Sequence, residues 1–213
     1  MTGTDTHTDT GTAIIDLGPQ TRIVARLAAG VRDEQLGDRT PCPAYAVRNL
    51  LGHLTGLAVA FRDAARKELG PTTDTPPDSA VPDIGPGRRE ELPRVLGELA
   101  EAWRDPAAWT GMTRAGGVDL PGEVAAAVAI DELVVHGWDL ARATGQVYVP
   151  DPAALQACHA FVVEVAADPT GGKGIFGPVV PVPSDAPLLD RAIGLSGRDP
   201  GWTREGASDG TGT

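Results

Sequence analysis

The chain of 213 residues carries 18 Lys and Arg against 29 Asp and Glu, which gives it a formal net charge of −11. Its length is ample for one domain with a continuous apolar core. The acidic balance, without any long basic run, argues against a surface for nucleic acid or for an anionic membrane.

The N-terminal residues and the apolar stretches predict a cytoplasmic protein. Residues 1–12 have no basic start and no apolar core of the kind that directs export. The longest apolar stretches, such as Val124 to Ile130, are far shorter than the roughly 20 residues of a membrane span. Cys42 and Cys158 are far apart in the sequence, so we expect reduced thiols rather than a cysteine zinc site or a disulfide framework.

Small polar residues dominate both ends of the chain. Segments of this composition have little apolar surface to bury, so we expect disordered tails at 1–13 and 206–213. Between them, residues 14–205 are predicted to form a single helical domain. Gly and Pro cluster between five stretches with helical periodicity, which predicts an all-α fold with no confident strand.

The first two helices are predicted at 19–29 and 47–69, because apolar residues recur at helical spacing in both. Gly30 offers a C-cap to the first. The second begins after Thr40-Pro41-Cys42-Pro43, whose prolines force an extended entry, and it stops at Gly70-Pro71.

The stretch 71–87, PTTDTPPDSAVPDIGPG, is too rich in Pro and Gly for a helix or a strand. It predicts a long surface loop of the kind that often acts as a lid. A third helix is predicted at 90–104, with Pro93 tolerated in its first turn. Residues 110–119 contain Gly116-Gly117, which fits either a small hairpin or a plain loop.

The fourth helix, at 122–144, has the clearest boundaries because Pro precedes it and Gly follows it. The fifth, at 152–167, begins with an Asp N-cap followed by Pro, and a short helix is predicted at 187–195. Residues 172–177 match the pattern GxGxxG, but no strand precedes them and a proline follows. A loop with chance spacing therefore fits better than a dinucleotide site.

Glu132 and His136 lie four residues apart on the fourth helix, so both side chains project from one face and can bind one ion. An isolated pair of this kind is more often an exposed Glu–His contact. Here the surrounding residues are apolar, which places at least one of the two polar groups near buried surface.

His53 lies on the apolar side of the second helix, where alone it would be a core histidine. If the second and fourth helices pack side by side, His53, Glu132 and His136 can converge as two imidazoles and one carboxylate. This set suits zinc or another borderline divalent ion. Three ligands leave a coordination position open, which is typical of catalytic rather than structural metals.

The segments that carry these residues resemble the DinB-like metal-binding family, which includes the mycothiol-dependent maleylpyruvate isomerases and related bacterial thiol transferases. The resemblance covers nearly all of the chain between the tails. It lies in Thr40-Pro41-Cys42-Pro43 leading into residues 47–54, in residues 131–145 and, for the actinobacterial branch, in Phe176-Gly177-Pro178, Asp190-Arg191 and Gly197-Arg198-Asp199-Pro200.

The resemblance implies a DinB-like four-helix bundle with additional short helices and long loops. It also implies that His53, Glu132 and His136 hold a divalent metal, with zinc expected first and nickel or another ion as alternatives. The chain departs from the family at Tyr45, where relatives usually carry Trp, and in the long 71–87 loop. Both departures concern the shape of the substrate rather than the metal.

The function implied by the resemblance is a mycothiol-dependent transferase or isomerase, in which metal-bound thiolate attacks a small electrophilic substrate. Mycothiol would be the thiol cosubstrate, and no nucleic acid or membrane would be a partner. Because no general acid stands out beside the triad, a non-catalytic metal- or small-ligand-binding protein of the same fold is the alternative. A third interpretation is a metal-free bundle with both histidines hydrogen-bonded to Glu132.

Three further residues near these motifs have two interpretations each. Asp139 can orient His136 from behind, but pairing with Arg142 is at least as expected. Cys42 is expected to pack as a small buried thiol outside the site. Arg48, in the first turn of a helix, is expected to be solvated rather than bound to a substrate carboxylate.

Two other features have structural interpretations. Adjacent helical residues point about 100° apart, so His159 is expected to be a surface histidine and not a base for Cys158. Trp103 and Trp138 are expected to fill the core with one edge wet.

Overall fold

The computed structural model describes residues 14–76, 81–84, 88–168 and 176–204. The expected tails at 1–13 and 206–213 lie outside these ranges, as do most of the 172–177 stretch and parts of the 71–87 loop. The described ranges are mostly helical, which confirms the predicted fold class. No helix in them combines the length and the apolar character that a membrane span requires.

Seven α-helices, one β-hairpin and two 3₁₀ turns make up the regular structure of the described ranges. The helices are α1 (Gly18–Ala29), α2 (Val47–Arg66), α3 (Pro71–Asp74), α4 (Arg88–Ala102), α5 (Gly122–Thr144), α6 (Pro152–Ala167) and α7 (Leu188–Leu195). The strands are β1 (Met112–Ala115) and β2 (Val118–Pro121), and the 3₁₀ turns are Asp33–Gln35 and Pro106–Trp109.

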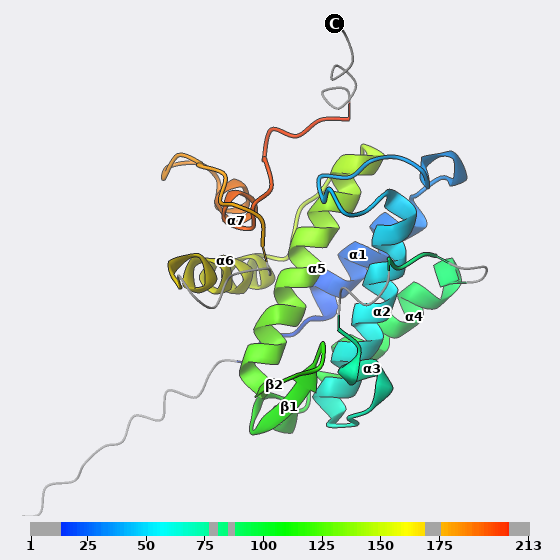
Figure 1. The fold of residues 1–213 in the computed structure, drawn as a ribbon, viewed down its shortest axis with the longest axis vertical. Coiled ribbons are helices and arrows are strands. Elements are labelled where there is room, and N and C mark those ends of the chain that lie inside the picture. The colour runs from blue at the N-terminus through cyan, green and yellow to red at the C-terminus, as the bar shows by residue number, and fades with distance from the viewer. Residues whose placement is uncertain (1–13, 77–80, 85–87, 169–175, 205–213) are drawn as a thin grey trace, which may run out of the picture.

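Four of the helices pack against one another around the apolar core (Figure 1). α2 contacts α4 and α5, and α1 contacts the same two helices. On the other side of α5, α6 packs against α5 and α7 packs against α6. Fully buried side chains from the three helices α2, α4 and α5 dominate this core: Leu50, Leu51, Leu54, Leu92, Leu96, Leu99, Ile130, Leu133 and Leu140.

α5 is the central helix, and its bounds are those predicted from the sequence. Gly145 ends it at φ 70°, and the Gly145 amide donates to the carbonyl of Ala141. Every residue from Leu133 to Ala141 is buried, because α1 and α2 cover one side of the helix and α6 covers another. A polar side chain in this stretch therefore needs a protein partner or a ligand.

α2 ends at Arg66, three residues earlier than predicted. Lys67 adopts the left-handed conformation, with φ 60° and ψ 24°, which breaks the run of helical hydrogen bonds. The Lys67 Nζ donates to the carbonyl of Ala108, at 3.1 Å. α1 and α4 differ from their predicted bounds by only one or two residues.

Of the two interpretations of residues 110–119, a small hairpin or a plain loop, the structure has the hairpin, which adds two short strands that were not confidently predicted. β1 and β2 pair antiparallel, with Met112 opposite Pro121 and Ala115 opposite Val118. Gly116 and Gly117 both have positive φ, at 60° and 78°, as a two-residue hairpin turn of the favoured hand requires.

The expected loop at 71–87 begins with a short helix instead, because α3 forms at Pro71–Asp74. Residues 81–84 lie directly on α2, where a Cβ on Gly52 would be 2.7 Å from the backbone carbon of Asp83. Arg48 Nε pairs with Asp83 Oδ1 at 3.0 Å, and Asn49 Nδ2 donates to the carbonyl of Pro82 at 2.8 Å. This segment is thus fixed against the part of α2 that precedes His53.

Candidate metal centre

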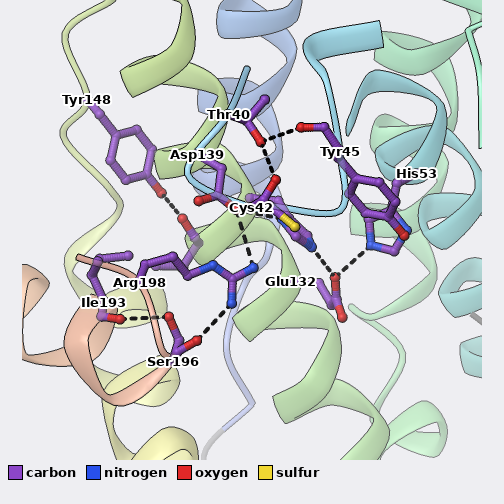
Figure 2. Close-up of polar contacts among 12 residues, drawn as sticks. Thr40, Cys42, Tyr45, His53, Glu132, Asp139, Tyr148, Ile193, Ser196 and Arg198 are labelled. Carbon is purple, nitrogen blue, oxygen red and sulfur yellow. Dashed lines mark hydrogen bonds and ion pairs between the residues drawn. The ribbon is translucent and has the colours of Figure 1, made fainter. Parts of the chain in front are cut away.

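The packing of α2 against α5 brings His53, Glu132 and His136 together (Figure 2). Glu132 Oε2 lies 3.1 Å from His53 Nε2 and 3.1 Å from His136 Nε2. One ligand atom from each residue lies within 4.8 Å of the other two. The three residues predicted from the sequence thus form one cluster of two imidazoles and one carboxylate.

The spacing within this cluster fits a single small cation. Ligand atoms about 2.0–2.1 Å from a tetrahedral zinc ion lie roughly 3.3 Å from one another. The two Glu132–histidine distances of 3.1 Å are close to that value. The two imidazole rings meet edge to face, with centroids 4.8 Å apart, so both rings direct a nitrogen toward the carboxylate without stacking.

One side of the cluster is open to solvent. The side chains of His53 and Glu132 are 15% and 26% exposed, whereas that of His136 is 9% exposed. The ring of Tyr45 lies 5.1 Å from the ring of His53 and 6.4 Å from that of His136, between centroids. Tyr45 therefore forms part of the wall beside the open side.

Asp139 holds His136 from behind. Its Oδ2 lies 2.9 Å from His136 Nδ1, and its side chain is fully buried. An ionised carboxylate can only accept, so Nδ1 carries the proton and Nε2 is directed into the cluster. Such a carboxylate–histidine pair is the usual support of a metal-binding imidazole.

The expected pairing of Asp139 with Arg142 is wrong. Arg142 lies over the ring of Trp138, 5.5 Å from its centroid, and donates to the carbonyl of Pro200 at 2.7 Å. Residues three apart on a helix share one face, which lets Asp139 reach His136 within a single turn. Of the two interpretations of Asp139, the orientation of His136 is therefore the one that the structure has.

The charges of the cluster are strongly coupled. Burial favours the neutral form of Glu132, but the hydrogen bonds and charges of the two histidines outweigh it and hold the pKa of Glu132 far below its usual range. Burial also favours neutral His136, but its hydrogen bonds to Asp139 and Glu132 raise its pKa to about 9. At neutral pH the metal-free cluster thus pairs a glutamate anion with an imidazolium, whose Nε2 proton a metal would replace.

The contact of Arg198 with the candidate centre was not predicted from the sequence. Arg198 follows α7, and its Nη2 lies 3.3 Å from Asp139 Oδ2 across a separation of 59 residues. No helical spacing or local motif connects the two positions. The only signal in the sequence was the resemblance of Gly197-Arg198-Asp199-Pro200 to a family segment, which assigned Arg198 no role.

The two cysteines are both buried, as free thiols. Burial, helped by the nearby Asp139 carboxylate, raises the pKa of Cys42, in agreement with its predicted role as a packing thiol. Cys158 donates to Asp131 Oδ1 at 3.3 Å, so its proton faces a carboxylate and not His159. Burial raises the pKa of Asp131 to about 7.

The remaining candidates occupy structural positions. Trp103 and Trp138 are buried, at 0% and 4% exposure. Arg48 is half-exposed, as expected, and pairs with Asp83. His159 is partly exposed on α6.

The sequence model of the mycothiol maleylpyruvate isomerase N-terminal domain matches residues 17–141. Two uncharacterized proteins, from two strains of Mycobacterium tuberculosis, are each 27% identical over 176 residues, which is 82% of this chain and 91% of the relative. Solved structures of a mycothiol-dependent maleylpyruvate isomerase and of a point mutant are 17% identical, with TM-scores of 0.44 and 0.45 over 67% of this chain. The matched part spans 65% of those chains.

The matched range contains α1, α2, α4 and most of α5, including His53, Glu132 and His136. It ends at residue 141, so α6, α7 and Arg198 lie beyond it. Because the match covers more than half of the sequence, the chain belongs to the mycothiol maleylpyruvate isomerase N-terminal domain family.

Proposed function

We propose that this protein binds one divalent metal ion through His53, Glu132 and His136 and serves as a mycothiol-dependent transferase or isomerase for a small electrophile. The observation that carries the proposal is the shared position of Glu132 Oε2, 3.1 Å from the Nε2 atoms of both histidines. Zinc is the ion we expect, because two imidazoles and one carboxylate suit borderline divalent ions better than Mg²⁺ or Ca²⁺.

The chain's own residues prepare the site for such an ion. Asp139 keeps the proton of His136 on Nδ1 and so leaves Nε2 as the ligand atom. Glu132 supplies the negative charge that a cation needs inside a partly buried site. Three protein ligands leave an open coordination position, and the exposed edges of His53 and Glu132 give a small molecule access to it.

The family supports a thiol as the small molecule that binds the metal at its open position, since the family is described as that of a mycothiol maleylpyruvate isomerase. A divalent cation at this site would lower the pKa of a bound thiol, so that the thiolate forms near neutral pH. Tyr45 lies beside His53 and would contact the thiol or the electrophile. Burial raises the pKa of Cys42, which disfavours its thiolate form.

We further infer that residues 14–205 act as one cytoplasmic domain built on a DinB-like four-helix bundle. Support comes from the mutual packing of α1, α2, α4 and α5. It also comes from one apolar cluster that runs from Leu17 to Ile193.

The first test is metal content per chain, measured by mass spectrometry on wild-type protein and on His136→Ala. The proposal expects close to one ion per chain in the wild type and a loss of that ion in the variant. His159→Ala is the matched control, because it removes a histidine of α6 that lies outside the cluster. Absence of metal in the wild type after reconstitution with Zn²⁺ or Ni²⁺ contradicts the proposal.

The second test addresses the reaction. Metal-loaded protein is titrated with mycothiol by calorimetry and then assayed with a panel of small electrophiles, with His136→Ala as the blank. Metal-dependent binding and consumption of the thiol or isomerisation of the electrophile supports the enzyme. Binding without any turnover supports the alternative, a non-catalytic metal- or small-ligand-binding protein of the same fold.

A further inference from the structure

Arg198 reaches the back of the metal centre from a part of the chain that lies beyond the family match. It follows α7, and its side chain runs toward α5 beside Ser196 and Asp139 (Figure 2). Its backbone amide donates to the carbonyl of Ile193 at 3.1 Å, and its Nη1 donates to the carbonyl of Ser196 at 2.9 Å. The first bond holds the backbone of Arg198, and the second holds its guanidinium beside Asp139.

Asp139 depends on this guanidinium for part of its charge compensation. The carboxylate is fully buried, and its Oδ2 receives both His136 Nδ1, at 2.9 Å, and Arg198 Nη2, at 3.3 Å. Its Oδ1 has no hydrogen-bond partner among the described residues. A buried carboxylate without sufficient positive charge or hydrogen bonds is costly, so each of the two contacts on Oδ2 matters.

The two contacts are not equivalent once His136 becomes a ligand. A metal-binding imidazole is neutral, so it offers Asp139 a hydrogen bond but no charge. Arg198 is then the cation in contact with Asp139 among the residues that the structure describes. Its side chain is 12% exposed, and a guanidinium keeps its charge at every relevant pH.

We propose that Arg198 is a positioning residue of the metal centre: it anchors the Asp139 carboxylate in the orientation that holds His136. Without the guanidinium, the carboxylate keeps one partner and can turn about its last side-chain bond, so the imidazole loses its fixed acceptor. The inference rests on the proposed metal-binding function. It extends that function to a residue outside the matched range of 17–141.

The experiment measures the Zn²⁺ affinity of full-length, metal-free protein by competition with a chromophoric chelator. Arg198→Met removes the charge and keeps the length of the side chain, whereas Arg198→Lys keeps the charge. Arg142→Met is the matched control, because Arg142 bonds the same C-terminal segment at Pro200 but does not touch Asp139. Asp139→Asn and the double variant Asp139→Asn/Arg198→Met complete a cycle.

We expect Arg198→Met to weaken Zn²⁺ binding by about 10–100-fold, as loss of a group that supports a metal ligand does. Arg198→Lys should recover most of that loss, and Arg142→Met should bind Zn²⁺ like the wild type. On the Asp139→Asn background, Arg198→Met should add little, because it acts through Asp139. The visible spectrum of the Co²⁺-loaded protein should shift in Arg198→Met and stay unchanged in Arg142→Met.

Two results overturn the inference while leaving the metal site intact. The first is a wild-type protein that binds Zn²⁺ together with an Arg198→Met variant of equal affinity. The second is a full additional loss on the Asp139→Asn background. If Arg198→Met does not fold, Arg198→Gln takes its place, and equal Zn²⁺ affinities for the Gln and Lys variants and the wild type count against the inference. A wild type without Zn²⁺ affinity overturns the proposed function itself.

Discussion

Among its neighbours, helix α2 makes its most extensive contacts with α4 and α5, and these two contacts differ in chemistry. Toward α4 the contact is mainly apolar, and α4 buries Leu92, Val95, Leu96 and Leu99 in the same cluster as the leucines of α2. One partly exposed ion pair, between Arg62 Nη1 and Glu98 Oε2 at 2.6 Å, also joins the two helices. Toward α5, His53 meets Glu132 and His136 instead. Burial of a leucine contributes about 1.5–3 kcal/mol to folding, whereas burial of charged groups costs free energy that their partners must offset.

The comparison separates stability from function. The α2–α4 contact needs no ligand, because its buried core is apolar and the charges of Arg62 and Glu98 compensate each other. The α2–α5 contact gathers three polar groups whose lone pairs converge, an arrangement that a cation would complete. We therefore expect changes on the α4 side to alter stability alone, and changes on the α5 side to alter ligand binding first.

The largest expected loss of stability comes from Leu96→Ala on α4. The side chain is 1% exposed, so its truncation leaves a cavity in the core. The free energy of unfolding should fall by about 2–5 kcal/mol, as measured by urea denaturation. The metal content of the folded variant should equal that of the wild type. A variant that loses its metal but keeps its stability would break the separation between the two sides.

Metal should stabilise the α5 side. At a Zn²⁺ concentration 100-fold above the dissociation constant, a ligand that binds only the folded state adds about 2.7 kcal/mol. The wild-type protein should therefore unfold at a higher temperature with excess Zn²⁺ than with a chelator. His53→Ala should lose this difference, and a Zn²⁺-induced rise that persists in this variant would place the metal elsewhere.

The metal-free protein should lose stability at alkaline pH. The pKa of His136 is raised from 6.5 to about 9 in the folded state, so its contribution is complete below pH 6.5 and is lost as pH rises toward 9. The expected decrease is on the order of 1–3 kcal/mol, by denaturation at a series of pH values. In His136→Ala the decrease should be absent, and an identical decrease there would assign it to another group.

The smallest effect is expected at the solvent-exposed face of α4. Arg94 is 57% exposed and pairs with Glu91 and Glu98 on its own helix. Exposed pairs of this kind contribute about 0–1 kcal/mol, so Arg94→Ala should lower the free energy of unfolding by no more than that amount. The metal content should stay unchanged. Thermal denaturation of this variant and of Leu96→Ala allows the two losses of stability to be compared. A loss as large as that of Leu96→Ala would contradict the inference that α4 stabilises the fold through its buried face.

The helices were predictable wherever local signals were strong. α5 has its predicted bounds because Pro121 and Gly145 are its N-cap and C-cap residues and define where the helix begins and ends. The predicted end of α2 was wrong because Lys67 takes the left-handed conformation, which a lysine rarely adopts and which its residue type does not signal. The Gly116-Gly117 turn admitted two outcomes, and the hairpin also has a tertiary contact, because Thr113 Oγ1 donates to the carbonyl of Ala64 on α2 at 2.6 Å.

The sequence by itself determined the helical fold class, the positions of the described helices other than α3 and the three residues of the cluster. These follow from periodicity, from Pro and Gly, and from the four-residue spacing of Glu132 and His136, which are local properties of a chain. The tertiary structure alone decided that Asp139 hydrogen-bonds His136 and that Arg198 pairs with Asp139. Such contacts depend on how α7 and its following segment pack on α5, and no local pattern specifies the approach of residues 59 positions apart.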